Sequence, residues 1–448
     1  MASTRVPGWV WVVLVGIHLL ALGWALNHRT WAFTDTDRYV QAAENLRLHG
    51  QLYARPWTGD APRGQAVQEF TIRPVGYPLA VWGLGGTGPW PVALLIFQNL
   101  LSLLNVGVVL VWWARRGQPR TTHWIWAGAS ILTFPAQFIY ANAVMSEMLL
   151  QTVVVAMAAL ILQFIKTRQK RYFAGAAGVV VLALLLKPVF CPLAAVLAGL
   201  GVVLAGWQRR FALALIGGVP LVVVGLYMGW NKQRTGYFHF SSIAEINLLQ
   251  YNAAGLVRQL AGSAAEEKWV TQVLQEANAQ PDFKARQHLI RARASAMLWA
   301  HPVVYARQQA QGMAAFFLDP GRFDVSQFLG LAPPAGGGLL AQARAGKLLR
   351  AVVSLPVPLL GWLAVVLLAN GSRLVLAVRG LRRLRTEGPM LRYGRWVAVG
   401  LLLYVAILTG PLGAARFLVP VWPLLLGLAL VGLKWNGKPI GSETSARR

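Results

Sequence analysis

The sequence is poor in charge and nearly free of cysteine. Only 13% of its 448 residues are Asp, Glu, Lys or Arg, whereas a soluble domain has roughly 25%. This low charge excludes an ordinary soluble protein. The single cysteine, Cys191, cannot form a disulfide within the chain. No internal repeat is evident in the sequence, which argues against the inverted-repeat transporters.

Apolar residues make up most of what is present. They account for 56% of the chain, and the mean hydropathy is +0.50. A net charge of +27 would indicate a nucleic-acid partner in a soluble protein. Here the basic residues gather in short linkers between apolar segments, as the positive-inside rule and anionic lipids favour. We therefore expect a membrane protein without a nucleic-acid partner.

Apolar segments long enough to cross a bilayer follow one another along the chain. The segment 172–206 is broken at Lys187-Pro188, since proline removes a helix donor, and it is divided there into two spans. The pattern predicts an all-α polytopic bundle of about ten transmembrane helices, with amphipathic helices on its outer face. The predicted spans are 8–27, 90–113, 123–140, 144–165, the two parts of 172–206, 211–230, 350–369, 394–412 and 416–433.

The distribution of positive charge predicts the orientation. With both termini in the cytoplasm, the inside loops and tails, together with Arg395, hold 21 of the 42 lysines and arginines, and the short outside turns hold only Lys187 and Arg416. Reading the short, glycine-rich segment 75–87 as a full span would place Arg115 and Arg116 outside. We therefore interpret that segment as interfacial or re-entrant.

Two long outer regions divide the chain. The predicted units are an N-terminal transmembrane module, 1–230, with a first outer loop at 28–89; a mainly helical outer region, 231–347; and C-terminal helices with a cytoplasmic tail, 348–448. Apolar spacing predicts an amphipathic helix near residues 39–50 and further helices over 264–280, 284–300 and 303–318. The segment 330–338, which is rich in proline and glycine, is expected to be a flexible linker.

The first outer loop holds five of the fifteen carboxylates, and two of them lie in Thr34-Asp35-Thr36-Asp37. A carboxylate at the membrane boundary can act as general base toward an acceptor hydroxyl or amine. The same four residues also form a good N-cap for the following helix. The sequence does not divide these two roles between Asp35 and Asp37, so both are candidate catalytic residues.

One acid and three bases lie near the outer ends of the spans. Glu147 opens a span, where an unpaired carboxylate is costly, so we expect a polar cavity or a cation beside it; the alternative is a residue satisfied by the helix dipole and Ser146. Cations at this level indicate an anionic partner such as a lipid phosphate, unless each reaches the headgroups alone. The three bases are Arg73, Lys187 and Arg416.

The order and spacing of several motifs resemble the GT-C class of membrane glycosyltransferases, in particular glycosyltransferase family 39. That family and its relatives include the protein O-mannosyltransferases and the aminoarabinose transferases of lipid A. The motifs are Asp35-x-x-x-Tyr39 with Ala43 and Gly50, Arg73-Pro74-x-Gly76-Tyr77-Pro78, Ser146-Glu147, Lys187-Pro188, His301-Pro302 with Tyr305, Asp319-Pro320, and Arg416-Phe417-x-x-Pro420-x-x-Pro423.

The resemblance implies an activity and residue roles. It implies transfer of a sugar, with inversion, from a polyprenyl-phosphate donor to a lipid, glycan or protein acceptor at the outer face of a bacterial inner membrane. Asp35 takes the position of the catalytic carboxylate, and Glu147 that of a second acidic residue. Arg73 takes the position of a base that contacts the donor phosphate, and Lys187 and Arg416 match further phosphate-binding cations.

The resemblance does not firmly imply a cofactor. Some relatives hold a metal with an acidic residue just before the basic-proline motif, and this sequence has Ile72 there. His239 and His301 are candidate ligands, although a lone histidine is more often structural. The alternative function is a transporter or polymerase of lipid-linked oligosaccharides, and a third is a membrane assembly protein without enzymatic activity.

Overall fold

The computed structural model describes residues 5–331, 353 and 356–434, and these residues form helices and connecting segments without a strand. Eight helical segments among them are long and apolar enough to cross a membrane. The chain is therefore a multi-pass, all-α membrane protein. The eight segments are Gly8–His28, Val92–Gly117, Glu147–Thr167, Pro188–Gln208, Ala212–Thr235, Val357–Leu384, Pro389–Leu408 and Ala415–Leu433.

The spanning helices correspond to most of the spans predicted from sequence. They are α1 (Gly8–His28), α4 (Val92–Gly117), α7 (Glu147–Thr167), α9 (Cys191–Gln208), α10 (Ala212–Thr235), α19 (Val357–Leu384), α20 (Pro389–Leu408), and α21 (Ala415–Leu418) continued by α22 (Trp422–Leu433). The remaining two predicted spans are shorter helices. One is α8 (Lys170–Leu186), and the other is divided into α5 (Thr121–Leu132) and α6 (Pro135–Ala141).

Proline explains why both of these predicted spans appear as shorter helices. Pro135 begins α6 after a break at Thr133 and Phe134, because the residue before a proline is disfavoured in the helical region. The same rule ends α8 at Leu186, and Lys187 is extended, with φ −146° and ψ 133°, before Pro188. Each break leaves polar backbone groups available to side chains from other helices.

Helix α19 differs from its predicted span, 350–369, and continues through most of the expected loop 370–393. Arg373 is fully buried in it and donates to the Ser130 hydroxyl at 3.0 Å and to the Thr133 carbonyl at 2.8 Å. A basic residue is therefore satisfied inside the bundle by the α5–α6 break. The predicted linker at 330–338 lies largely outside the described residues.

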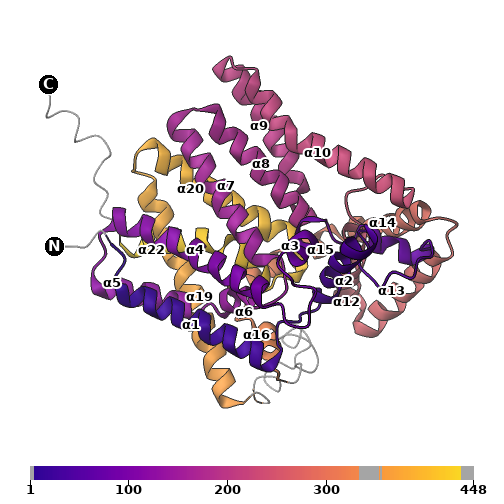
Figure 1. Ribbon diagram of the computed structural model, residues 1–448, viewed down its shortest axis with the longest axis horizontal. Coiled ribbons are helices and arrows are strands. Elements are labelled where there is room, and N and C mark those ends of the chain that lie inside the picture. The colour runs from indigo at the N-terminus through magenta and orange to yellow at the C-terminus, as the bar shows by residue number, and fades with distance from the viewer. Residues whose placement is uncertain (1–4, 332–352, 354–355, 435–448) are drawn as a thin grey trace.

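The polar part of the chain forms short helices gathered at one end. Figure 1 shows α2, α12, α13 and α14 together at the right, with α5 at the opposite end of the bundle. The helices predicted near 39–50 and over 264–280, 284–300 and 303–318 are confirmed. The members of this layer are α2 (Thr36–His49), η1 (Gly64–Phe70), α3 (Gly76–Gly83), α11 (Ile243–Asn247), η3 (Leu248–Ala253), α12 (Ala254–Ala261), α13 (Ser263–Asn278), α14 (Phe283–Ala300), α15 (Pro302–Leu318) and α16 (Arg322–Phe328).

Close helix packing holds the spans together. Gly201 of α9 faces Gly217 of α10, and a Cβ on Gly201 would come within 2.6 Å of the Leu213 carbonyl oxygen. Small residues at such crossings let helix backbones approach within a membrane, where packing rather than water exclusion drives association. Three further short segments are η2 (Pro188–Phe190), η4 (Gly410–Leu412) and η5 (Val419–Val421).

Candidate active site

Asp35 lies between α1 and α2 and binds two arginines. Its Oδ1 accepts from Arg73 Nη2 at 2.5 Å, and its Oδ2 accepts from Arg416 Nη2 at 2.8 Å. Although Asp35 occupies the N-cap position of α2, its side chain makes no capping hydrogen bond. The backbone of Asp35 is therefore at the cap position, whereas its carboxylate accepts hydrogen bonds from two arginines that are distant in sequence.

Glu147, the first residue of α7, also binds two cations. Its Oε1 accepts from Arg416 Nε at 2.6 Å and from Lys187 Nζ at 2.8 Å, and its side chain is fully buried. Because Arg416 contacts both carboxylates, the five side chains form one continuous chain of alternating charge. We call this chain the ion network, and its order is Arg73, Asp35, Arg416, Glu147, Lys187.

Backbone contacts bring the two halves of the ion network together. The Val144 amide donates to the Trp31 carbonyl at 2.9 Å, and the Thr36 hydroxyl donates to the Val144 carbonyl at 3.2 Å. Thr36 directly follows Asp35, and Val144 is three residues before Glu147. The segment after α1 is therefore joined to the segment before α7, which places the two carboxylates at the same end of the bundle.

Amide side chains inside the bundle fix the segment that precedes Glu147. Gln98 Nε2 donates to the Ala143 carbonyl at 2.7 Å, and the Tyr77 hydroxyl donates to Gln98 Oε1 at 2.8 Å. Asn99 donates to Asn142 Oδ1 at 2.8 Å. All of these groups are buried, and buried polar groups that are satisfied in this way specify one arrangement of the backbone.

Two tyrosines face the arginines of the network. The Arg73 guanidinium lies 5.1 Å from the centre of the Tyr39 ring, and the Arg416 guanidinium lies 5.9 Å from that of Tyr140. Both distances are within the range of cation–π attraction. Tyr39, four residues after Asp35, thereby contacts the base that binds Asp35.

The ion network is partly open and carries excess positive charge. Three cations face two carboxylates, and the side chains of Asp35 and Arg416 each remain 19% exposed. An arginine has five N–H donors and a lysine has three, so the bonds described above use only part of their capacity. The three cations therefore have N–H donors left with which to bind an anion.

The charges around Asp35 determine its ionisation. Burial raises the pKa of this carboxyl group, but the attraction of Arg73 and Arg416 outweighs burial and leaves the pKa well below its usual range. Asp35 is therefore ionised at neutral pH and, while both arginines contact it, is a weak base.

Asp37, the second candidate for catalysis, lies apart from the ion network. It is exposed in the first turn of α2. None of the ion pairs among the described residues includes it. The structure thus brings together five of the six residues singled out from sequence and leaves Asp37 outside.

Two carboxylates behind the ion network were not singled out as site residues from the sequence. Asp324 Oδ1 accepts from the Tyr140 hydroxyl at 2.8 Å, and Asp319 Oδ2 accepts from the Ala415 amide, beside Arg416, at 2.8 Å. Burial, with a smaller contribution from Asp319, raises the pKa of Asp324 to about 7. The only sequence signal is the Asp319-Pro320 pattern, which includes Asp319 but not Asp324.

The histidines considered as metal ligands lie elsewhere. His239 is buried, with Nε2 2.8 Å from the Thr71 hydroxyl and Nδ1 2.8 Å from the Tyr237 carbonyl, and His301 precedes α15. Among the described residues, no group of three His, Cys, Asp or Glu side chains is arranged to hold a metal ion.

Comparison with known proteins gives matches only among solved structures. No protein-family model matches the sequence, and no curated protein matches it. ArnT from Cupriavidus metallidurans in the apo state is 18% identical, with a TM-score of 0.36 over 95% of this chain and 76% of that chain. ArnT bound to undecaprenyl phosphate is 17% identical, with a TM-score of 0.35 over 96% of this chain and 77% of that chain.

A third match is the arabinosyltransferase EmbB from Mycobacterium smegmatis. It is 16% identical, with a TM-score of 0.34, and the match covers 96% of this chain and 41% of that chain. Similarity at this level does not establish a substrate or a residue role for the present chain.

Proposed function

We propose that this protein is an inverting glycosyltransferase that moves a sugar from a polyprenyl-phosphate donor to an acceptor at the outer face of the membrane. The observation that carries the proposal is the ion network. It places an ionised carboxylate among three cations at the end of a membrane bundle. A carboxylate and a phosphate site at one position are what this reaction needs.

The cations bind the phosphate of the donor. Arg73 and Arg416 offer forked N–H donors that match phosphate oxygens, and Lys187 offers a point charge. As the bond between the anomeric carbon and the phosphate oxygen breaks, negative charge grows on the leaving phosphate. Cations already fixed in place stabilise that charge in the transition state.

Asp35 acts on the acceptor. Its carboxylate accepts a hydrogen bond from the attacking hydroxyl or amine and takes the proton as the new bond to the anomeric carbon forms. In the free protein, Arg73 and Arg416 hold the pKa of Asp35 low. A bound phosphate competes for the same two arginines, so the basicity of Asp35 rises when the donor is in place.

Glu147 holds two of the cations in position. Its buried Oε1 contacts both Arg416 and Lys187, and a buried carboxylate with two cationic partners resists displacement. We assign Glu147 a positioning role, and the acid–base role to Asp35 rather than to Asp37, which none of the cations contacts.

The test is an Asp35→Asn variant compared with Asp37→Asn. Reconstituted protein is given undecaprenyl-phosphate-linked hexoses and pentoses with a membrane-lipid extract, and release of undecaprenyl phosphate is measured. We expect Asp35→Asn to lose about 10²-fold to 10⁴-fold in rate while still binding undecaprenyl phosphate. Asp37→Asn removes the same charge two residues away and should retain most of the activity.

Two results would overturn this proposal. Full activity of Asp35→Asn would remove its role as the base. Equal loss in both aspartate variants would show that negative charge in the loop, rather than the position of Asp35, supports the reaction.

A further inference from the structure

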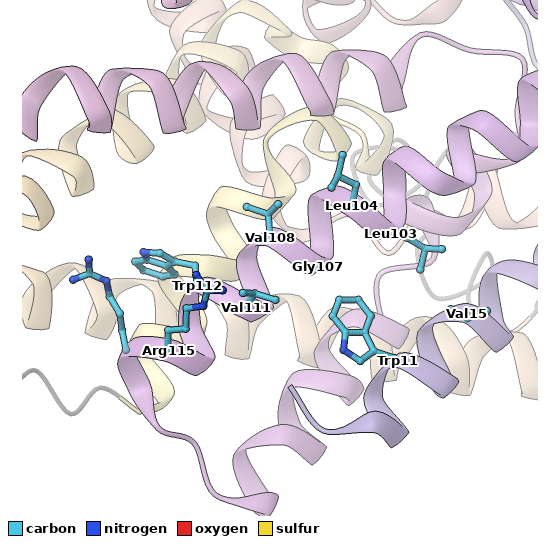
Figure 2. A pocket seen from close by; sticks show the side chains of 10 residues that line it. Trp11, Val15, Leu103, Leu104, Gly107, Val108, Val111, Trp112 and Arg115 are labelled. Atoms are coloured by element: carbon cyan, nitrogen blue, oxygen red, sulfur yellow. The ribbon is translucent and has the colours of Figure 1, made fainter. Parts of the chain in front are cut away.

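A groove runs between α1 and α4, away from the ion network. Its volume is about 770 Å³, and its walls are almost entirely apolar. Figure 2 shows Trp11 and Val15 of α1 facing the side chains of α4 across it. The α4 side of the groove is formed by Leu103, Leu104, Gly107, Val108, Val111 and Trp112.

The absence of a side chain at Gly107 makes room for Trp11. A Cβ on Gly107 would lie 2.8 Å from Cη2 of the Trp11 ring, closer than real Cβ contacts allow. The indole therefore lies against the backbone of α4. Leu104 and Val108, the neighbours of this contact, remain 55% and 46% exposed, so the groove has an apolar surface that the described chain does not cover.

One end of the groove is positively charged. Arg115 and Arg116 line it in the last turn of α4. Neither arginine takes part in an ion pair among the described residues. Lys434 lies nearby, with Nζ 3.3 Å from the Gln118 carbonyl, and adds to the positive field at this end.

We propose that this groove binds an anionic phospholipid, with its phosphate between Arg115 and Arg116 and one acyl chain along α4. The distance from Leu103 to Arg115 along the helix is about 18 Å, at roughly 1.5 Å per residue. One leaflet of the hydrocarbon core is about 15 Å thick. The apolar part of the groove therefore matches one leaflet, with the two arginines at headgroup level.

Charge favours a lipid over another protein helix. A second apolar helix in this groove would cover the two arginines without supplying an anion, and charges left unpaired in a membrane are costly. An anionic phospholipid fills the apolar walls and neutralises the cationic end together. Basic sites between transmembrane helices bind anionic headgroups in this way.

The first test measures lipid retention by the full-length protein. Native mass spectrometry in detergent is used to compare phosphatidylglycerol with phosphatidylcholine of the same acyl chains. We expect wild type to retain phosphatidylglycerol in preference, and Arg115→Gln/Arg116→Gln to weaken that retention about tenfold while leaving phosphatidylcholine unchanged. Lys166→Gln/Arg209→Gln removes two exposed cations that line no described groove, and should retain the preference of wild type.

The second test fills the groove without changing its charge. Val108→Trp should reduce retention of both lipids, whereas Val203→Trp, at a 66% exposed position of α9, should not. If a variant fails to give a monodisperse sample, photoactivatable phosphatidylglycerol is crosslinked to the wild-type protein instead. The label should then appear between Leu103 and Arg116.

Three results would overturn the proposal. The first is equal retention of the two phospholipids by wild type. The second is labelling concentrated away from α1 and α4. The third is a preference for undecaprenyl phosphate over phosphatidylglycerol that Arg115→Gln/Arg116→Gln abolishes, which would make the occupant of this groove a polyprenyl phosphate. Each outcome is independent of sugar transfer and of the ion network.

Discussion

The two ends of the helical bundle carry charge in different ways. At one end, three cations and two carboxylates contact one another in the ion network, and Glu147 is fully buried. At the other end, Arg115, Arg116, Arg120 and Lys434 belong to no ion pair among the described residues. A charged side chain that is buried away from solvent requires a partner of opposite charge. A lysine or arginine side chain at a helix end can instead reach the lipid headgroups.

This difference separates the charges that we propose take part in chemistry from those that contact lipid. Cations at the edge of a bundle help to orient it and contact lipid. A network of five mostly buried charges is weak evidence for stability, because replacing buried ion pairs by well-packed apolar residues is often neutral or stabilising. Its presence at one end therefore favours a role in binding or catalysis, and the following predictions test that contrast.

The largest effect is expected from Glu147→Gln. The change leaves Lys187 and Arg416 around a neutral acceptor inside the bundle, and removing one partner of a buried ion pair costs about 3–5 kcal/mol. We expect a clear fall in melting temperature in detergent, together with loss of transfer. A melting temperature equal to that of wild type would contradict the buried position of this carboxylate.

A smaller effect is expected for Arg73→Ala in donor binding. Arg73 contacts only Asp35 within the ion network, so we expect Arg73→Ala to give a folded protein that binds undecaprenyl phosphate about tenfold more weakly. Titration of purified protein with undecaprenyl phosphate measures this. The matched control is Arg63→Ala, an exposed base in the same loop, and unchanged affinity in Arg73→Ala would remove this cation from the phosphate site.

The next effect in order of size is expected at Asp324, and it depends on pH. Burial raises the pKa of this carboxyl group from 3.8 to about 7, so the folded protein holds its proton more tightly than the unfolded chain does. Protonation of Asp324 therefore stabilises the folded state. This stabilisation is fully present below pH 3.8 and is lost as the pH rises to about 7. Asp324→Asn should therefore raise the melting temperature relative to wild type by a few degrees more at pH 8 than at pH 5. A difference that is independent of pH would refute this.

The smallest effect is expected from Glu276→Gln, away from both ends of the bundle. Glu276 of α13 pairs with Arg293 of α14 at 2.6 Å, and the Arg293 and Glu276 side chains are 56% and 30% exposed. Exposed pairs contribute little to stability. Its melting temperature should be nearly that of wild type, and a fall comparable to that of Glu147→Gln would remove the distinction between buried and exposed pairs.

The sequence predicts the helices well because hydrophobic length and periodicity determine them. The amphipathic helix predicted over 303–318 appears as α15 (Pro302–Leu318), and the proline at 188 marks the end of α8. Helix α19 was harder to predict, because Arg373 resembles a loop cation until the carbonyl of Thr133, freed by a break in another helix, is seen to accept from it.

The site could be predicted as a set of residues but not as a set of contacts. Charges in an apolar chain are few, so Asp35, Glu147 and the three cations stand out. Which of them pair is decided by long-range packing, such as the Thr36–Val144 contact. The distinction between Asp35 and Asp37 depends on two arginines distant in sequence, and the buried position of Asp324 depends on Tyr140, which no local pattern reveals.

The most direct test of the phosphate site is a cryo-electron microscopy map of the protein with undecaprenyl phosphate added. We expect phosphate density in contact with Arg73, Lys187 and Arg416, and a bond between Arg73 and Asp35 that lengthens as the phosphate binds. Phosphate density found only at the opposite end of the bundle, with the ion network unchanged, would contradict the proposed function.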